Sequence, residues 1–201
     1  MLFRSSLQMS LELVSHELFE TIQFPFNLVT REPADDLIGR ARRNGLGFIV
    51  MKPLCGGQYD DAELAFRFLN EWPDLLPIPG IETAAEIEQI VEVVASGRTL
   101  EGESLRRAHE VAERLGKLFC RRCGYCLPCP QGIEVNMAMV WDSFVQRFPR
   151  ERLLAGPAHV VAKAAECIRC GACESRCPYN LSIMDTIAAN AKAAVAALAQ
   201  K

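Results

Sequence analysis

Eight of the nine cysteines in this 201-residue chain lie in two short runs, and no other feature constrains the fold as strongly. The run nearer the C-terminus consists of Cys167, Cys170, Cys173 and Cys177 followed by Pro178, which is the spacing C-x2-C-x2-C-x3-C-P. Three thiolates separated by two residues can bind three irons of one 4Fe–4S cubane from a single loop. A fourth, after a longer gap, reaches the other cluster in two-cluster proteins. The spacing therefore predicts iron–sulfur ligands.

The second run repeats this layout earlier in the chain. It consists of Cys120, Cys123, Cys126 and Cys129 followed by Pro130, and its final gap is two residues instead of three. Both runs place a glycine directly after the second cysteine, Gly124 in one and Gly171 in the other, where the backbone must pass close to the cluster sulfides. The eight sulfurs suit two 4Fe–4S clusters.

The fourth ligand of each cluster can be assigned in two ways. In an exchanged arrangement each run gives three ligands to one cluster, Cys177 completes the cluster of the earlier run, and Cys129 completes that of the later run. Alternatively each run is self-contained. Zinc is the competing metal, but zinc sites use two pairs of ligands separated by a longer loop. The ninth cysteine, Cys55, stands alone in a Gly-rich loop and is interpreted as a packing residue.

Composition narrows the class of protein. Half of the residues are hydrophobic and 23% are charged, which is typical of a globular chain. A net charge of −3 and a pI near 5.7 argue against a nucleic-acid partner. The sequence lacks an apolar run of the roughly 18 residues needed to span a membrane, and its N-terminus lacks the pattern of a secretion signal. We therefore expect a cytoplasmic protein, where clustered thiols indicate metal or redox chemistry.

The first hundred residues alternate between helical and strand patterns. Periodicity predicts helices over residues 7–18, 35–44, 61–71 and 84–95, and strands over 21–24, 48–51 and 76–78. In the last of these helices, Ile87, Ile90, Val91 and Val94 form one apolar stripe. Such alternation with short connections indicates successive βα units of a parallel sheet. Three units do not complete a barrel of roughly 250 residues; the alternative is a small three-stranded α/β layer.

After Gly97 the sequence is helical except at the cysteine runs. Helices are expected over residues 103–118, 151–166 and 182–200, and over the segment in which Met137, Val140, Trp141, Phe144, Val145 and Phe148 mark one face. The segment between the runs, residues 130–166, is helical rather than hairpin-like, which favours an all-helical ferredoxin-like arrangement. The predicted fold class is α/β plus all-α, with domains at residues 1–98 and 99–201.

Three segments of the first domain resemble the aldo/keto reductase family. They are residues 19–27 (FETIQFPFN), 50–57 (VMKPLCGG) and 76–80 (LPIPG). More narrowly, the chain resembles bacterial and archaeal members that end in a 4Fe–4S ferredoxin-like domain, and both cysteine runs fit that subfamily. The resemblance covers nearly all of the chain from Leu7 onward. It implies that the three strands are the last three of a TIM-type (β/α)8 barrel.

The resemblance also implies which site residues are present. The catalytic Asp, Tyr, Lys and His of the family lie on earlier strands, so the chain alone is expected not to be catalytic. Gln23 matches the position that holds the nicotinamide amide of NADP(H), and the loop from Lys52 and the turn from Gly80 match phosphate-contacting regions. Alternatively Gln23 and Lys52 are ordinary polar residues at strand ends.

Two functions remain open. In the first, the chain is the C-terminal part of an aldo/keto reductase-like oxidoreductase in which the iron–sulfur module is intact. In the second, it is a stand-alone electron-transfer subunit whose half-barrel docks on a partner chain. The expected partners are an electron donor or acceptor protein, or the missing half of the barrel. Neither a nucleic acid nor a membrane is expected as a partner.

Overall fold

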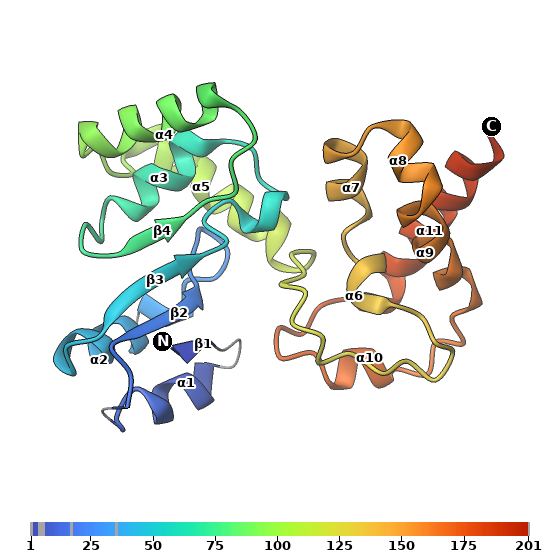
Figure 1. Cartoon of the computed structure of the whole chain (residues 1–201), viewed down its shortest axis with the longest axis horizontal. Helices are drawn as coiled ribbons and strands as arrows, with labels where there is room; N and C mark the ends of the chain where they lie inside the picture. Colours follow the sequence, from blue (N-terminus) through green and yellow to red (C-terminus); the bar gives the residue numbers. More distant parts are fainter. Residues whose placement is uncertain (1, 4–6, 17, 35, 201) are drawn as a thin grey trace. The chain divides into compact units, whose positions relative to one another are not determined.

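A computed structural model describes residues 2–3, 7–16, 18–34 and 36–200, and it divides the chain into two compact units (Figure 1). The first unit is Met1–Gly116 and the second is Lys117–Lys201. Among the described residues, no helix is long and apolar enough to cross a membrane.

The first unit contains a parallel sheet flanked by helices (Figure 1). Its strands, in the order in which they pair, are β1 (Leu2–Phe3), β2 (Thr21–Pro25), β3 (Gly47–Met51) and β4 (Leu76–Ile78). Its helices are α1 (Leu7–Leu13), α2 (Leu37–Arg43), α3 (Ala62–Leu69), α4 (Ala84–Ser96) and α5 (Gly102–Gly116), with short 3-10 turns η1 (Glu32–Ala34) and η2 (Cys55–Gly57).

The three predicted strands are neighbours in this sheet and are all parallel, as the alternation of patterns indicated. Ile22 and Phe24 of β2 are buried against the core, and the rings of Phe26, Phe68 and Trp72 pack on one another at centroid distances of 4.9 to 5.2 Å. The short strand β1 was not predicted, because two residues are too few to carry a periodic pattern. A barrel is a further prediction that this open sheet leaves untested.

The exposure of the α4 side chains differs from the apolar stripe predicted for this helix. Only Ile90 of the four stripe residues is buried, at 8% exposed, whereas Ile87, Val91 and Val94 are between 47% and 59% exposed. Val93 is the other buried residue of this helix. The apolar residues of α4 cover more than one face of the helix, so periodicity alone could not tell which face packs.

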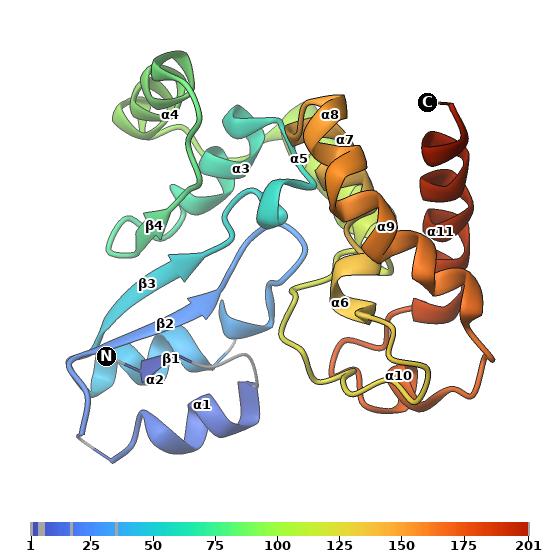
Figure 2. The same cartoon turned by 45° about the vertical axis from the view of Figure 1, so that its right-hand side comes forward.

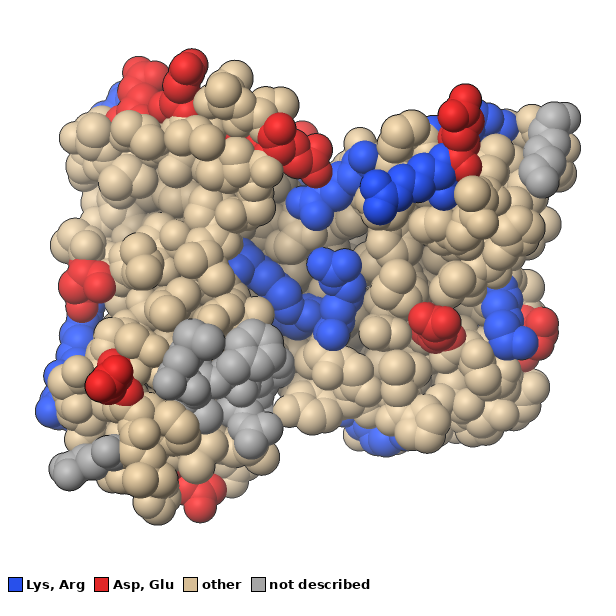
Figure 3. All heavy atoms as spheres, viewed as in Figure 1, with Lys and Arg blue, Asp and Glu red and all other residues tan. Residues whose placement is uncertain are grey.

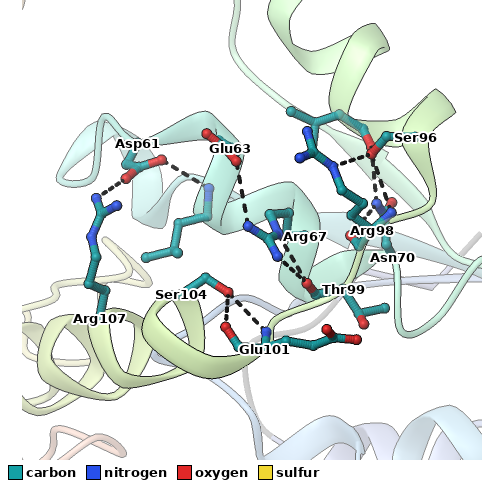
Figure 4. A network of polar contacts seen from close by, with 12 residues as sticks. Asp61, Glu63, Arg67, Asn70, Ser96, Arg98, Thr99, Glu101, Ser104 and Arg107 are labelled. Atoms are coloured by element: carbon teal, nitrogen blue, oxygen red, sulfur yellow. Dashed lines mark hydrogen bonds and ion pairs between the residues drawn. The ribbon is translucent and has the colours of Figure 1, made fainter.

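Helix α5 groups with the first unit, although the sequence assigned it to the second domain. Figure 4 shows the polar contacts that join it and the segment before it to α3. Arg107 donates to the carboxylate of Asp61 at 2.6 Å, and the guanidinium of Arg67 donates twice to the carbonyl oxygen of Thr99. The division of the units therefore falls after Gly116 rather than after residue 98.

The regular elements described in the second unit are all helices. Its elements are α6 (Val135–Ala138), α7 (Trp141–Arg147), α8 (Arg150–Ala155), α9 (Pro157–Ala162), η3 (Lys163–Glu166), α10 (Ala172–Ser175) and α11 (Ile183–Ala199). Helices α9 and α11 lie side by side in Figures 1 and 2, and Val161, Ile187 and Ala191 are buried in the core of this unit.

Two helix predictions in this unit need correction. The helix expected over residues 151–166 is divided, because Gly156 and Pro157 separate α8 from α9 and Pro157 begins a new helix. The single helix face expected from Met137 to Phe148 is divided between two helices, α6 and α7. One of its residues, Val145, is 50% exposed. The remaining members of that face pack in or against the core, as predicted.

Candidate metal centre

The two cysteine loops have the same backbone conformation. The residue before the second cysteine has a φ of 54° at Arg122 and 53° at Arg169, and the glycine after it has a φ of 83° at Gly124 and 78° at Gly171. A side chain at either glycine would meet no heavy atom within 4 Å. The chain itself therefore requires glycine at these two positions for the left-handed backbone conformation.

This conformation turns backbone N–H groups toward sulfur. The N–H of Arg122 donates to Cys120 Sγ at 3.4 Å, and the N–H of Arg169 donates to Cys167 Sγ at the same distance. Hydrogen bonds of this kind stabilise negative charge on a thiolate, and they lie at equivalent places in the two loops. The repeat seen in the sequence is thus a repeat in three dimensions as well.

The eight cysteines gather around two hollows, each ringed by four sulfurs. The first hollow, termed site A, is lined by Cys120, Cys123, Cys126 and Cys177. The second, termed site B, is lined by Cys129, Cys167, Cys170 and Cys173. Each site takes three cysteines from one run and the last cysteine of the other run. This grouping is that of the exchanged arrangement, and it differs from the self-contained one.

Burial makes the thiols at the back of both sites hard to ionise. Burial, with a smaller contribution from the neighbouring Cys120 and Cys123, raises the pKa of Cys126 to about 11. Burial also raises the pKa of Cys173, the equivalent residue in site B. Thiolates are the metal-binding form, so these positions favour ionisation only when positive charge occupies the hollow. Four thiols around an apolar hollow therefore fit a cationic iron–sulfur core.

The same donors do not converge on a point. Among the described residues, no group of three or more His, Cys, Asp or Glu side chains is placed to hold one metal ion. A single zinc ion would draw its ligands to within about 2.0 to 2.3 Å of one position. The cysteines instead line two separate hollows.

Arginines lie close to both sites in different ways. Arg121 lines site A and is buried, whereas Arg176 lines site B and is exposed. Arg169 forms an exposed ion pair with Asp185 at 2.7 Å. Arg176 was not among the predicted site residues, and its only signal in the sequence is its place in the longer final gap of the later run.

Basic side chains also gather away from the cysteines. In the view of Figure 3, Lys and Arg side chains lie together over α7 and α8, the helices that carry Arg147, Arg150 and Arg152. This part of the second unit is positively charged on the visible face. By contrast, acidic side chains lie over α4, whose exposed residues include Glu86, Glu88 and Glu92.

The residues proposed for a nicotinamide nucleotide lie on, or shortly after, three neighbouring strands of the sheet. Gln23 is half-buried on β2, Lys52 follows β3 with a φ of 53°, and Gly80 follows β4. The carbonyl oxygen of Lys52 accepts a hydrogen bond from Asn27 Nδ2 at 2.8 Å. Their role in nucleotide binding stays a prediction. Cys55 is fully buried in the first unit, as expected for a packing residue.

The model of a 4Fe–4S dicluster domain matches residues 119–182, the segment that contains both cysteine runs. No curated protein and no solved structure matches the chain. The match and the clustered cysteines support iron–sulfur cofactor binding by this segment, and with it an electron-transfer role. The prediction from cysteine spacing is confirmed at this level. The aldo/keto reductase resemblance finds no support in these comparisons and stays a prediction.

Proposed function

We propose that the second unit carries two 4Fe–4S clusters, one in each site, and that it moves single electrons through them. The observation that carries this proposal is the division of eight cysteines into two rings of four, each completed by the other run. The match to a dicluster domain supports it. When bound, each cluster supplies a centre that can gain and lose one electron without breaking a bond.

The exchanged arrangement keeps the two sites close along the chain. Cys126 belongs to site A and Cys129 to site B, with Leu127 and Pro128 between them. The later run likewise passes from site B at Cys173 to site A at Cys177. Two short stretches of backbone, residues 127–128 and 174–176, therefore connect ligands of the two sites, which favours electron transfer within the unit.

The chain's own residues give each site its environment. Cysteine thiolates hold the irons, the N–H groups of Arg122 and Arg169 donate to cysteine sulfur, and buried apolar side chains form the walls. Ile183 and Leu181 line site A, while Ile133 and Val135 line site B. Such walls limit access of water, which is one of the factors that set a cluster's potential.

Anaerobic reconstitution tests the proposal. Iron and acid-labile sulfide are counted, and the reduced protein is examined by electron paramagnetic resonance. About eight irons and eight sulfides per chain, with the signal of two interacting centres, agree with two 4Fe–4S clusters. Four of each, or bound zinc without sulfide, would contradict it.

Two further variants separate the exchanged arrangement from the self-contained one. Both start from a chain in which Cys120, Cys123 and Cys126 are replaced by alanine, so that only site B can be filled. Adding Cys129→Ala should abolish the remaining cluster, whereas adding Cys177→Ala should leave about four irons. The opposite result would show that each run holds its own cluster. The two variants carry the same number of substitutions and so control for each other.

We also propose that the first unit is part of an aldo/keto reductase-like oxidoreductase. Two features support this. Strands β2, β3 and β4 follow one another in a parallel sheet, as in a barrel, and one face of α4 exposes the apolar side chains of Ile87, Val91 and Val94. Further βα units that pair with β4 would cover that face. In the alternative function, the first unit provides this surface to a partner chain, and the second unit alone carries the activity.

Titration with NADPH, followed by the fluorescence of the nicotinamide, tests the reductase proposal. We expect binding that weakens in Gln23→Ala and in Lys52→Met. Glu151→Gln, an exposed change in the second unit, serves as the control and should leave binding unchanged. Binding that none of these changes affects, or no binding at all, would favour the stand-alone electron-transfer subunit.

A further inference from the structure

The two sites have matching backbones but different charges. Counting from the first cysteine of each run, Arg121 of the earlier run corresponds to Ile168 of the later run. Arg121 is only 4% exposed and lines site A, whereas Ile168 is 62% exposed and lines site B. The repeat is therefore broken at a position directly after a cysteine, where site A has a buried cation and site B has an exposed apolar residue.

Aromatic rings hold Arg121 in place. Its guanidinium carbon lies 4.6 Å from the ring centroid of Phe119 and 4.0 Å from that of Tyr179, and one of its nitrogens donates to the carbonyl oxygen of Phe119 at 3.0 Å. Both distances are within the range of cation–π contacts. A guanidinium keeps its charge at all ordinary pH values, so this charge is permanent. Because it is buried, water and salt screen it less than they screen a surface arginine.

Asn136 adds a second polar group to site A. Its Oδ1 atom is buried and has no hydrogen-bond partner in the described part of the chain, although the side chain lines the hollow. Rotating the amide by half a turn places Nδ2 there instead, as an N–H donor for a cluster sulfur; the two orientations differ only in which atom is assigned as nitrogen. Asn136 therefore fits a site that holds an acceptor such as sulfide.

The charge of the arginine at site B is screened more strongly than that of Arg121. Arg176 is exposed, and its guanidinium donates to three carbonyl oxygens, those of Ala172, Cys126 and Pro128. The remaining wall of site B is largely apolar, and it includes Met184 and Ile187. Solvent screens the charge of an exposed arginine.

We propose, on the premise that two clusters are bound, that Arg121 gives site A the higher reduction potential of the two. Adding an electron makes a cluster more negative, and a buried cation with an N–H donor stabilises that added charge. An electron supplied by a one-electron reductant therefore moves from site B to site A. Site B is then oxidised and site A is reduced by one electron, and no bond forms or breaks. The asymmetry gives the electron transfer a direction.

A redox titration of the reconstituted protein, with dithionite as reductant and electron paramagnetic resonance as readout, tests this. Replacing Cys120, Cys123 and Cys126 by alanine leaves only site B to be filled, and replacing Cys167, Cys170 and Cys173 by alanine leaves only site A. Each potential is then measured alone. We expect Arg121→Met to lower the potential of site A by at least 59 mV, which is a tenfold change in its one-electron equilibrium. Site B should be unchanged. Arg121→Lys should restore part of the shift, since it keeps the charge.

Lys117→Met is the control, because Lys117 is an exposed cation of the same unit outside both cysteine loops. Equal shifts in Arg121→Met and Lys117→Met, or a site B potential above that of site A, would overturn the inference. Iron and sulfide are counted on every sample. A wild-type chain with fewer than two clusters would instead overturn the proposed function. Should Arg121→Met take up no iron, Asn136→Leu gives an independent result: a lower potential at site A supports the asymmetry, and an unchanged one contradicts it.

Discussion

The guanidinium of Arg176 donates a hydrogen bond to the carbonyl oxygen of Cys126 at 2.9 Å, across 50 positions of sequence. It also donates to the carbonyl oxygen of Pro128 at 2.9 Å and to that of Ala172 at 2.8 Å. One side chain thus joins both cysteine loops. It occupies the position by which the final gap of the later run exceeds that of the earlier run, so the irregular spacing has a structural use.

Arg176→Met should therefore loosen the contact between the two loops. A buried hydrogen bond from a charged donor contributes about 1.5 to 3 kcal/mol to stability. Because Arg176 is exposed, we expect about 1 to 2 kcal/mol for its contacts. The expected result is that the variant loses iron to a chelator roughly tenfold faster than the wild-type chain does. The decay of visible absorbance measures this rate. Arg150→Met is the control, because Arg150 makes one exposed contact, to Gln200. Equal rates in the two variants would show that Arg176 does not hold the loops together.

Alanine at either loop glycine should destabilise the iron-loaded protein. Gly124 and Gly171 have left-handed backbones, and an L-residue there costs about 1 to 2 kcal/mol. No clash with the rest of the chain adds to this cost, because neither Cβ would meet a heavy atom of the protein within 4 Å. Gly124→Ala and Gly171→Ala should therefore lower the urea midpoint of cluster loss by similar amounts. Gly116→Ala, at the end of a helix and also without a Cβ contact, is the control and should be neutral or slightly stabilising. Unequal losses at the two loop positions would contradict the equivalence of the loops.

The sequence predicted the local features of the site and missed those that depend on tertiary packing. Cysteine spacing is a property of single loops, so all eight proposed ligands could be named before the fold was known. Which run completes which site depends on how the loops face each other, and spacing left both arrangements open. The burial of Arg121 depends on Tyr179, which lies 58 positions further along the sequence, and no local pattern indicates this contact.

In the first unit the same limit appears on α4. Helical periodicity identified the helix and its start at residue 84, where the structure shows a capping box formed by Thr83 and Glu86. It did not identify the packed face, because Val93 lies among several other apolar residues that are exposed. An apolar stripe identifies the packed face of a helix when the opposite face is polar. It does so less well when apolar residues lie on several faces of the helix.

Asp61 has two separable roles, and two substitutions should distinguish them. One carboxylate oxygen caps α3 by accepting from the N–H of Leu64 at 2.9 Å, and the other accepts from Arg107 at 2.6 Å. Asparagine can still cap a helix, so Asp61→Asn should lose only the exposed ion pair, about 0.2 to 1 kcal/mol. Asp61→Ala should lose both, about 1 to 2 kcal/mol in total.

Urea unfolding of the first unit, followed by Trp72 fluorescence in a Trp141→Phe background, measures both costs. Trp72 lies in the first unit and Trp141 in the second, and they are the two tryptophans of the chain. Arg107→Met serves as the control and should match Asp61→Asn, since both remove the same ion pair. If Asp61→Asn proved as costly as Asp61→Ala, the ion pair rather than the cap would be the main stabilising contact.

A matched pair of substitutions on α4 tests which face of this helix is packed. Ile87 is 47% exposed and Ile90 is 8% exposed, so the same change to alanine removes side chains of equal size from two environments. Ile90→Ala should cost about 2 to 4 kcal/mol, because it leaves a cavity. Ile87→Ala should change stability by no more than about 0.5 kcal/mol, since alanine is also the better helix former. Trp72 fluorescence again reports the urea midpoints. Equal costs would mean that Ile87 is covered in solution; a midpoint that rises with protein concentration would then identify the cover as a second molecule, because association stabilises the folded state by mass action.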